Sequence, residues 1–387
     1  MTSVSTVDTA EHAVTPSRAV RRPAITAPVS EPRDVEALLD AGASELYCGV
    51  QPRNAASEQA GVEHANRRDD AGSNLRDYRE LESVVRRARA RGADVFLALN
   101  NHFTAASLPL AEEQIERAAE AGVAAFIVAD AALLPVLAAK APRVPLHLSS
   151  VAAAFNGEAL AFWRERGFAR AVLPRHLTEG EMAELVRAAP GTELEVLVMN
   201  DGCHLVDGHC GFLHPIQQAP SLAGKLLTNP TIERLLRPVT AHIPATLFRG
   251  MLEESDLLPC HLKEDEVVVE VEPGAEAGEV DVEQVRRYHL DYMTVSRVRY
   301  RCALCSVGAL ARAGVRSLKV AGRRYALSQR VADVRSLAAA LDLAEGGLDG
   351  EPLVRACEDL FEKNRGFACK REYCYFSPGG WRGDTSA

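Results

Sequence analysis

The sequence contains no hydrophobic run long enough to cross a membrane, and its first twenty residues include no hydrophobic stretch. A membrane-spanning helix needs ~20 apolar residues, and a secretory signal needs an apolar segment near the N-terminus. We therefore expect a cytoplasmic protein without membrane association. In that compartment the nine cysteines, an odd number, are expected as reduced thiols and not as disulfides.

An excess of positive charge is also lacking, since the formal net charge is −9. Proteins that bind nucleic acid usually carry a broad basic surface. The acidic balance therefore disfavours RNA as a substrate, although a local cleft lined by arginine could still hold phosphate.

The chain has 387 residues, of which 47% are hydrophobic, so it can bury a large core in one or two domains. Residues 1–23 are rich in Ser, Thr, Ala, Val and Arg without periodicity, which predicts a disordered leader.

From residue 24 onward, short apolar runs alternate with amphipathic segments, several of which end in glycine. This alternation is typical of βα units with a parallel sheet. The expected strands are 25–29, 44–50, 93–100, 123–130, 144–150, 169–174, 192–200 and 317–322. Seven strands before residue 200 and an eighth near residue 320 predict an α/β protein with a closed TIM-like (β/α)8 barrel.

The regular alternation stops near residue 211 and resumes near residue 300. We expect the barrel over 24–210 and 300–326, and an insertion or lid subdomain over 211–299, between strands seven and eight. Residues 327–387 are expected to form C-terminal helices and an irregular tail that carries Cys369 and Cys374.

Four basic side chains near strand ends are candidates for catalysis, because functional groups of such barrels gather at the carboxyl ends of the strands. Lys319 and Arg323 flank the eighth strand end, and Arg175 and His176 follow the sixth. An arginine can bind a carboxylate through two parallel hydrogen bonds, and a lysine supplies a compact charge. The structural alternatives are a buried ion pair for Lys319 and helix capping for Arg175 and His176.

Polar uncharged residues at other strand ends are candidates for substrate binding. They are Asn100, Ser149, Ser150 and Asn200. Turn formation is the alternative for the asparagines, since turns favour this residue. His147, inside an expected strand, is more often a core histidine than a functional one.

Two pairs of cysteines lie beside expected strands. Cys203 and Cys210 follow ELEVLVMNDG, and Cys302 and Cys305 precede ARAGVRSLKVAGR. Folding can bring the pairs together as soft thiolate ligands of an iron–sulfur cluster or a zinc ion. The alternative is packing, because cysteine often behaves as a small buried hydrophobe, and Cys48 and Cys357 fit that role.

Several segments of the chain resemble one known family. They are AGASELYCGV, NLRDYRELESVVRRARARGADVFLALN, HLSSVAAAFNGEALAFWRERGFARAVLPRHLTEGEM, ELEVLVMNDGCHLVDGHC, CALCSVGALARAGVRSLKVAGR and KNRGF. The chain resembles the collagenase-like peptidase family U32, which includes proteins of oxygen-independent ubiquinone hydroxylation and of tRNA and rRNA hydroxylation. The resemblance covers about residues 25–210 and 300–370.

The resemblance implies a [4Fe-4S] cluster. Its ligands would be Cys203, Cys210, Cys260 and Cys302, with Cys305 in reserve. The chain departs from the family where Met199 replaces a usual His, His209 a usual Arg and Ala321 a usual Glu. These departures point to a divergent member with its own chemistry.

The resemblance further implies an iron–sulfur enzyme of oxygen-independent hydroxylation, or of a related oxygen or redox transfer. A carboxylate-bearing donor similar to prephenate would supply the oxygen, and the acidic balance favours a small metabolite as acceptor. A non-catalytic, cluster-bearing subunit of a heterodimeric hydroxylase is the alternative, followed by a peptidase or an RNA hydroxylation protein. Proteolysis ranks low because the sequence has no G-x-S-x-G or H-E-x-x-H motif, and cluster ligands cannot also be free nucleophiles.

Overall fold

The computed structural model describes residues 21–51, 65–68, 72–105, 107–202, 207–208, 300–370 and 373–376. Within these ranges eight parallel strands close into a barrel in sequence order, and β8 pairs with β1. The strands are β1 (Ala24–Pro28), β2 (Glu45–Cys48), β3 (Asp94–Leu99), β4 (Ala125–Val128), β5 (Leu146–Leu148), β6 (Phe168–Val172), β7 (Glu193–Met199) and β8 (Ser317–Val320). The predicted (β/α)8 barrel is confirmed.

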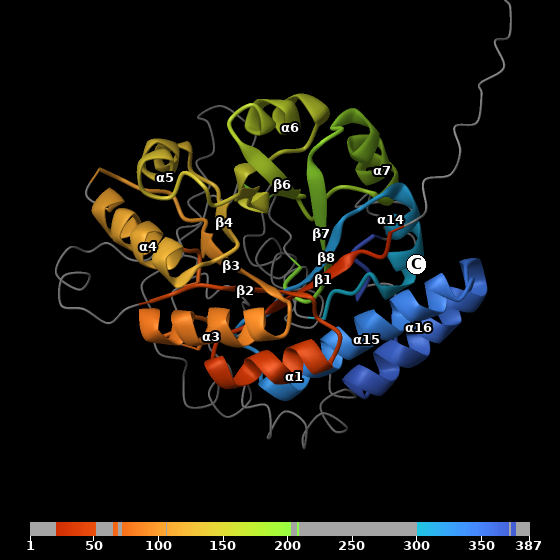
Figure 1. Ribbon diagram of the computed structural model, residues 1–387. Coiled ribbons are helices and arrows are strands. Elements are labelled where there is room, and N and C mark those ends of the chain that lie inside the picture. The colour runs from red at the N-terminus through yellow and green to blue at the C-terminus, as the bar shows by residue number, and fades with distance from the viewer. Residues whose placement is uncertain are drawn as a thin grey trace, which may run out of the picture.

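Helices surround the barrel as an outer ring, which Figure 1 shows. They are α1 (Val35–Asp40), α3 (Tyr78–Ala90), α4 (Leu108–Ala121), α5 (Leu134–Lys140), α6 (Gly157–Arg164), α7 (Glu179–Ala188), α14 (Val307–Ala313), α15 (Leu327–Glu345) and α16 (Gly350–Arg365). Short 3-10 turns occur at η1 (Pro32–Asp34), η2 (Ala131–Leu133), η3 (Ser150–Ala152) and η4 (Leu304–Ser306). The predicted insertion over 211–299 and most of the predicted leader lie outside the described residues.

Helices α3, α6, α7 and α16 begin at residues whose side chains cap the first turn. At α3 the Asp77 side chain accepts a hydrogen bond of 2.9 Å from the Glu80 backbone nitrogen. Such a cap satisfies one of the free N–H groups of the first turn. The buried side chains of α3 are Tyr78, Leu81, Val84, Val85 and Ala88. Their helical spacing gives one continuous face, which packs against the barrel and its neighbouring helices.

Apolar side chains form two separate layers because successive side chains of a strand point to opposite faces. The larger layer, to which Leu46 and Leu97 belong, lies between the strands and the helices. A small second cluster is made of Tyr47, Phe96, Ala125 and Ile127. These four alternate with members of the large layer, so they point into the barrel. Much of the remaining interior is polar.

A buried polar clamp attaches the C-terminal helices to the barrel. Asn200, directly after β7, donates a hydrogen bond of 2.7 Å to Asp333 of α15 and accepts one of 2.7 Å from Arg365 of α16. Arg365 and Asp333 form an ion pair of 3.0 Å, with side chains 1% and 0% exposed. The Tyr375 hydroxyl donates to the backbone oxygen of Asn200. The clamp thus joins α15, α16 and the tail to the end of β7.

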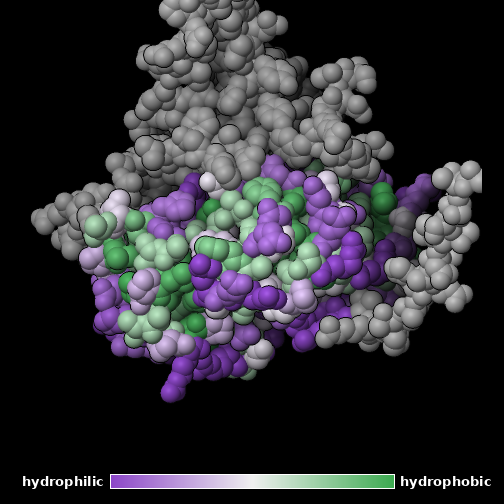
Figure 2. All heavy atoms as spheres, turned by 90° about the horizontal axis from the view of Figure 1, so that it is seen from above, coloured by the Kyte–Doolittle hydropathy of each residue, from purple (hydrophilic) through white to green (hydrophobic). Residues whose placement is uncertain are grey.

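The described helices include none that is long and apolar enough to cross a lipid bilayer. On the face seen in Figure 2, hydrophilic and hydrophobic residues are interspersed over the described part of the chain. Among all described residues, the exposed large hydrophobic side chains are Phe162 and Val354. The guanidinium of Arg166 covers the Phe162 ring at 3.4 Å from its centroid.

Candidate active site

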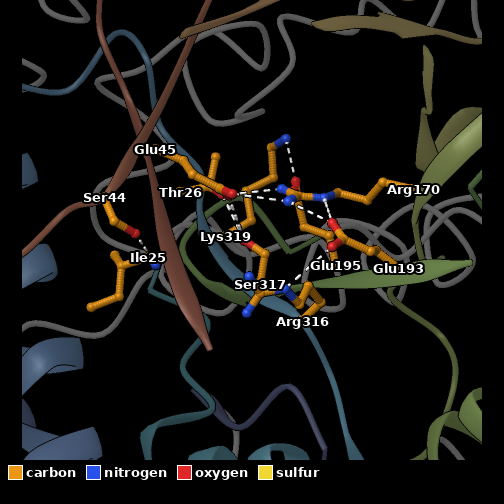
Figure 3. A network of polar contacts seen from close by, with 10 residues as sticks. All are labelled: Ile25, Thr26, Ser44, Glu45, Arg170, Glu193, Glu195, Arg316, Ser317 and Lys319. Atoms are coloured by element: carbon orange, nitrogen blue, oxygen red, sulfur yellow. Dashed lines mark hydrogen bonds and ion pairs between the residues drawn. The ribbon is translucent and has the colours of Figure 1, made fainter. Parts of the chain in front are cut away.

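Charged side chains form a hydrogen-bonded network inside the barrel (Figure 3). Arg170 of β6 donates to both carboxylate oxygens of Glu45 of β2, at 2.7 and 2.9 Å. It also donates to Glu195 of β7 at 3.1 Å, and Lys319 of β8 donates to Glu195 at 2.7 Å. The remaining hydrogen-bonded members are Thr26, Glu193, Arg316 and Ser317.

Lys319 therefore occupies the buried ion pair that the sequence offered as the alternative to a catalytic role. Its side chain is 8% exposed and that of Glu195 is 1% exposed. Burial alone would raise the pKa of Glu195, but the charges of Lys319 and Arg170 overcome this and hold it at about 2. The Lys319 nitrogen also lies 4.2 Å from the centroid of the Tyr47 ring.

His147 of β5 faces the same interior. Burial, reinforced by the positive charge of Arg170, lowers its pKa to about 3, so the ring is neutral at physiological pH. The ring contacts Phe96 edge to face, with centroids 4.6 Å apart. Its Nδ1 atom is buried and has no hydrogen-bond partner within the described residues. The imidazole is thus held in the neutral form by its surroundings.

Arg323 lies beyond the end of β8 among neutral amides. Its guanidinium donates to the side-chain oxygens of Asn66 at 2.8 Å and Asn74 at 3.0 Å. These two bonds orient the guanidinium. A Cβ atom at Gly49 would overlap Arg323 and both asparagines, so this close approach requires glycine. The Arg323 side chain lies 6.0 Å from the Tyr47 centroid, on the ring that Lys319 also contacts.

A second polar group surrounds Asp201, which follows β7. Its carboxylate forms an ion pair of 2.9 Å with Arg68 and accepts a hydrogen bond of 2.7 Å from the Tyr325 hydroxyl. Arg175 donates to the Asp201 backbone oxygen at 2.5 Å and pairs with Asp207 at 3.2 Å. Burial raises the pKa of Asp201, but Arg68 and other nearby arginines outweigh it, so the net direction is down.

Backbone strain accompanies this second group. Asn200 and Asp201 have φ angles of 64° and 43°, in the left-handed region that residues other than glycine seldom adopt. Such conformations persist only where surrounding contacts enforce them, and they cluster at functional sites. The strained backbone makes the end of β7 a candidate functional position.

The two polar groups share one electrostatic neighbourhood centred on Tyr47. Burial raises the pKa of this tyrosine, and its hydroxyl experiences the charges of Arg323, Asp201, Arg68 and Glu195. The structure therefore brings Lys319 and Arg323 together at one ring, with Arg175 attached to the adjoining Asp201 group. Chemically, these guanidinium groups can bind a carboxylate or a phosphate, and the Asp201 and Tyr325 pair can hold a proton.

The other predicted site residues occupy several places. Asn100 accepts from the Arg67 backbone nitrogen and donates to Ser149, both at 3.2 Å. Ser150 begins the turn η3 and is buried. His176 adjoins Arg175, and both of its ring nitrogens are buried. Asn200 belongs to the clamp described above, which uses both atoms of its side-chain amide.

Three of the predicted cluster ligands, Cys203, Cys210 and Cys260, lie outside the described residues. Cys302 is described and buried, and it forms backbone bridges with Met199 at the end of β7 and with Cys374 of the tail. Two cysteines beside a barrel strand end fit the thiolate chemistry of an iron–sulfur cluster. In the part of the chain that the structure describes, no group of three His, Cys, Asp or Glu side chains is arranged to hold a metal. The cluster stays a prediction.

Sequence reasoning offered a buried ion pair for Lys319 but identified neither its partners in the interior network nor the Asp201 group. The signal for the network is a charged residue at alternate positions of an otherwise apolar strand. Glu45, Arg170 and Glu195 each stand in this way. In a closed barrel covered by helices, such a residue has no route to solvent and must find a partner across the barrel.

Comparison with known sequences identifies a family. The profile of peptidase family U32 matches residues 30–227. The tRNA hydroxylation protein P of Escherichia coli is 25% identical over 189 residues, which are 49% of this chain and 39% of that protein. The tRNA hydroxylation protein P of Helicobacter pylori is 29% identical over 150 residues, 39% of this chain and 35% of that protein. The matches thus span well under half the length of these relatives.

Comparison with solved structures finds a U32 peptidase among the similar chains. It is 14% identical, with a TM-score of 0.41, and the match covers 80% of this chain and 97% of that one.

Proposed function

Because the chain belongs to peptidase family U32, we propose that it takes part in an oxygen-independent hydroxylation at the carboxyl ends of its barrel strands. The observation that carries the proposal is the gathering of Arg323, Arg68 and Arg175 around Tyr47 and Asp201. Hydroxylation without molecular oxygen needs another compound to donate the oxygen atom. A carboxylate-bearing donor of the prephenate type suits these guanidinium groups.

The side chains divide into binding and proton-holding roles. Arg323, oriented by Asn66 and Asn74, binds the carboxylate of the donor. The hydrogen bond between Tyr325 and Asp201 holds a proton at the strained end of β7. The neutral ring of Tyr47 separates this region from the charged barrel interior.

A [4Fe-4S] cluster belongs to the same proposal. Cys302 would hold it together with Cys203, Cys210 and Cys260, with Cys305 in reserve. Such a cluster would supply electron transfer beside the strand ends. The backbone bridge between Cys302 and Met199 supports this location, because Cys302 is a proposed ligand and Met199 ends β7.

We propose tRNA as the acceptor, since the relatives that match carry names of tRNA hydroxylation proteins. Arg68 and Arg175 support this, because their side chains remain 28% and 19% exposed and can contact a phosphate. A small metabolite is the second candidate. The net charge of −9 favours it, as the sequence analysis predicts.

The partner-subunit function is supported by two positions without polar side chains. Met199 and Ala321, where family members usually carry His and Glu, are buried at the ends of β7 and β8. A subunit that has lost reacting groups would retain the fold and act only beside a related partner.

Deletion of the gene followed by mass analysis of tRNA nucleosides tests the proposal. We expect loss of a hydroxylated nucleoside, with recovery by the wild-type gene and by Arg355→Ala but not by Arg323→Ala. Arg355 is the matched control because its side chain is exposed and, among the described residues, pairs with Glu351 of its own helix. Unchanged tRNA with an altered metabolite profile would favour the small-molecule acceptor. Activity that appears only after a related subunit is added would favour the partner function.

A further inference from the structure

Three buried side chains meet at the backbone of Gly49, the residue that follows β2. They are Arg323, from beyond β8, and Asn66 and Asn74, from the segment between β2 and β3. A Cβ atom at Gly49 would lie 2.2–2.5 Å from an atom of each of these side chains. Because real Cβ contacts are longer than 3.0 Å, the three side chains can converge here only on a glycine.

The Asn66 amide is 1% exposed and forms three hydrogen bonds. Its oxygen accepts from Arg323 at 2.8 Å and from the Arg68 backbone nitrogen at 3.1 Å. Its nitrogen donates to the Asn74 side-chain oxygen at 3.1 Å. Exchanging the two amide atoms would set an NH2 group against two donors and an oxygen against another oxygen. The neighbours therefore determine that the Asn66 oxygen faces the guanidinium.

Backbone hydrogen bonds attach both asparagines to strand ends. Leu75, which directly follows one of them, donates from its nitrogen to the Gly49 oxygen at 2.9 Å, beside the end of β2. Ala65, which directly precedes the other, accepts from the Asn101 nitrogen at 3.3 Å, beyond the end of β3. The two amide oxygens are thus fixed relative to the barrel, and through them so is the guanidinium of Arg323.

A neutral acceptor and a charged acceptor have different effects on an anion that binds the same guanidinium. The amide oxygen of Asn66 orients Arg323 and adds no formal charge. A carboxylate at position 66 would accept the same two hydrogen bonds, and the adjacent guanidinium would keep it ionised. Its negative charge would then lie beside that of an incoming carboxylate in a buried site, where like charges repel strongly.

We propose that Asn66 is a specificity-determining positioning residue, whose neutral amide oxygen orients Arg323 for a ligand that carries a carboxylate. The inference rests on the proposed function, in which the carboxylate of the oxygen donor binds Arg323. It adds that position 66 must be neutral. A purely structural role would require only a hydrogen-bond acceptor of the same shape. Aspartate has that shape and lacks the neutrality, so it separates the two roles.

The test measures binding of prephenate to the full-length protein by isothermal titration calorimetry. Asn66→Ala should weaken binding about tenfold, because the guanidinium keeps its charge and loses one orienting hydrogen bond. Asn66→Asp should weaken it at least about 100-fold, because two like charges then share a buried site. Asn156→Asp is the matched control. It adds the same charge at the exposed first residue of α6, where aspartate caps a helix as well as asparagine does, and should bind like the wild type.

A double variant shows whether Asn66 acts through Arg323. In the Arg323→Ala background, Asn66→Ala should cause no further loss of affinity, because the group that it orients is gone. Circular dichroism and thermal melting of each variant establish that it is folded before affinities are compared. If Asn66→Asp does not fold, the comparison of Asn66→Ala in the two backgrounds still decides the proposal.

Two outcomes would overturn the inference on Asn66 alone. They are binding to Asn66→Asp that equals or exceeds binding to Asn66→Ala, and a further loss on Asn66→Ala in the Arg323→Ala background. If Arg323→Ala loses prephenate while both Asn66 variants keep it, the inference fails and the proposed donor site stands. If Arg323→Ala binds prephenate like the wild type, the donor site and the inference fail together, and the analysis of tRNA nucleosides still reports on the hydroxylation.

Discussion

At the scale of single residues, burial decides how strongly a charged side chain of this protein can bind a ligand. Arg323 is 6% exposed and held between amide oxygens, whereas Arg355 is in solvent. A desolvated guanidinium gains much more from a carboxylate than a solvated one, because water no longer competes for its hydrogen bonds. An arginine at position 323 therefore gains much more binding energy from a carboxylate than an arginine at position 355.

Arg323→Ala should weaken binding of prephenate or a related dicarboxylate by roughly 2–5 kcal/mol, because the substitution removes a charged hydrogen-bond donor from a desolvated site. Arg355→Ala should change binding by less than about 0.5 kcal/mol, as expected for an exposed residue away from special features. Isothermal titration calorimetry on both variants measures the difference. Equal affinities would show that Arg323 does not contact the donor.

His147 should make stability depend on pH. Its ordinary pKa is 6.5, and the folded barrel lowers it to about 3. Between these two pKa values His147 is protonated in the unfolded chain but neutral in the folded protein. Its contribution to the free energy of unfolding is therefore fully present above about pH 6.5 and is lost as the pH falls toward 3. The slope is about 1.4 kcal/mol per pH unit. Urea unfolding of His147→Phe at several pH values should show that slope reduced.

His102→Gln is the matched control for that measurement, because the His102 ring is 59% exposed whereas His147 is buried. The Glu195 carboxylate affects the free energy of unfolding over a lower pH range than His147. Its pKa falls from 4.5 to about 2, so its contribution is lost only below about pH 4.5. An unchanged slope in His147→Phe would contradict the assignment.

At the scale of elements, the clamp at Asn200 holds the C-terminal helices on the barrel. Arg365→Leu should destabilise the protein by roughly 3–5 kcal/mol, because it leaves the buried Asp333 carboxylate without its charge partner. Chemical unfolding measures the loss, and limited proteolysis should show earlier cleavage near α16. Arg355→Leu, on the exposed face of the same helix, should unfold like the wild type. A mild effect of Arg365→Leu would mean that other contacts position α16.

The elements themselves were predictable because their periodicity is local. Each expected strand is a short apolar run, and the structure has a strand at every one of those positions. Helix α14 was not predicted. It has only seven residues and includes Gly308, a weak helix former, so its pattern is too short to detect.

The site was less predictable because its contacts are not local. The positions of Arg175 and Arg323 at strand ends followed from the barrel. The partners of Glu45 and Glu195 depend on closure, which brings strands far apart in the sequence to opposite walls of one interior. Asp201 depends on a left-handed backbone and on Arg68 from a distant loop. No spacing rule encodes either contact.

At the scale of the whole molecule, the iron content decides the nature of the centre. Protein purified without oxygen should be brown, with about four iron and four sulfide per chain, because thiolate-bound clusters of this type absorb visible light. Cys302→Ala should remove the colour, whereas Cys48→Ala, inside the barrel wall, should keep it. A colourless protein with one zinc per chain would show a structural metal site instead. If Cys305→Ala removes the iron and Cys260→Ala does not, then Cys305 and not Cys260 is the fourth ligand.

The interior network in Figure 3 also constrains how this barrel can exchange parts with other barrels. Its three carboxylates, Glu45, Glu193 and Glu195, face the three cations Arg170, Arg316 and Lys319. Glu45 comes from β2 and the other five come from β6 to β8 and the residue before β8. A recombination between β4 and β5 would therefore take Glu45 from one parent and its partner Arg170 from the other. Unless both parents carried the same charges, the hybrid would bury an unpaired ion, so we expect such hybrids to be destabilised.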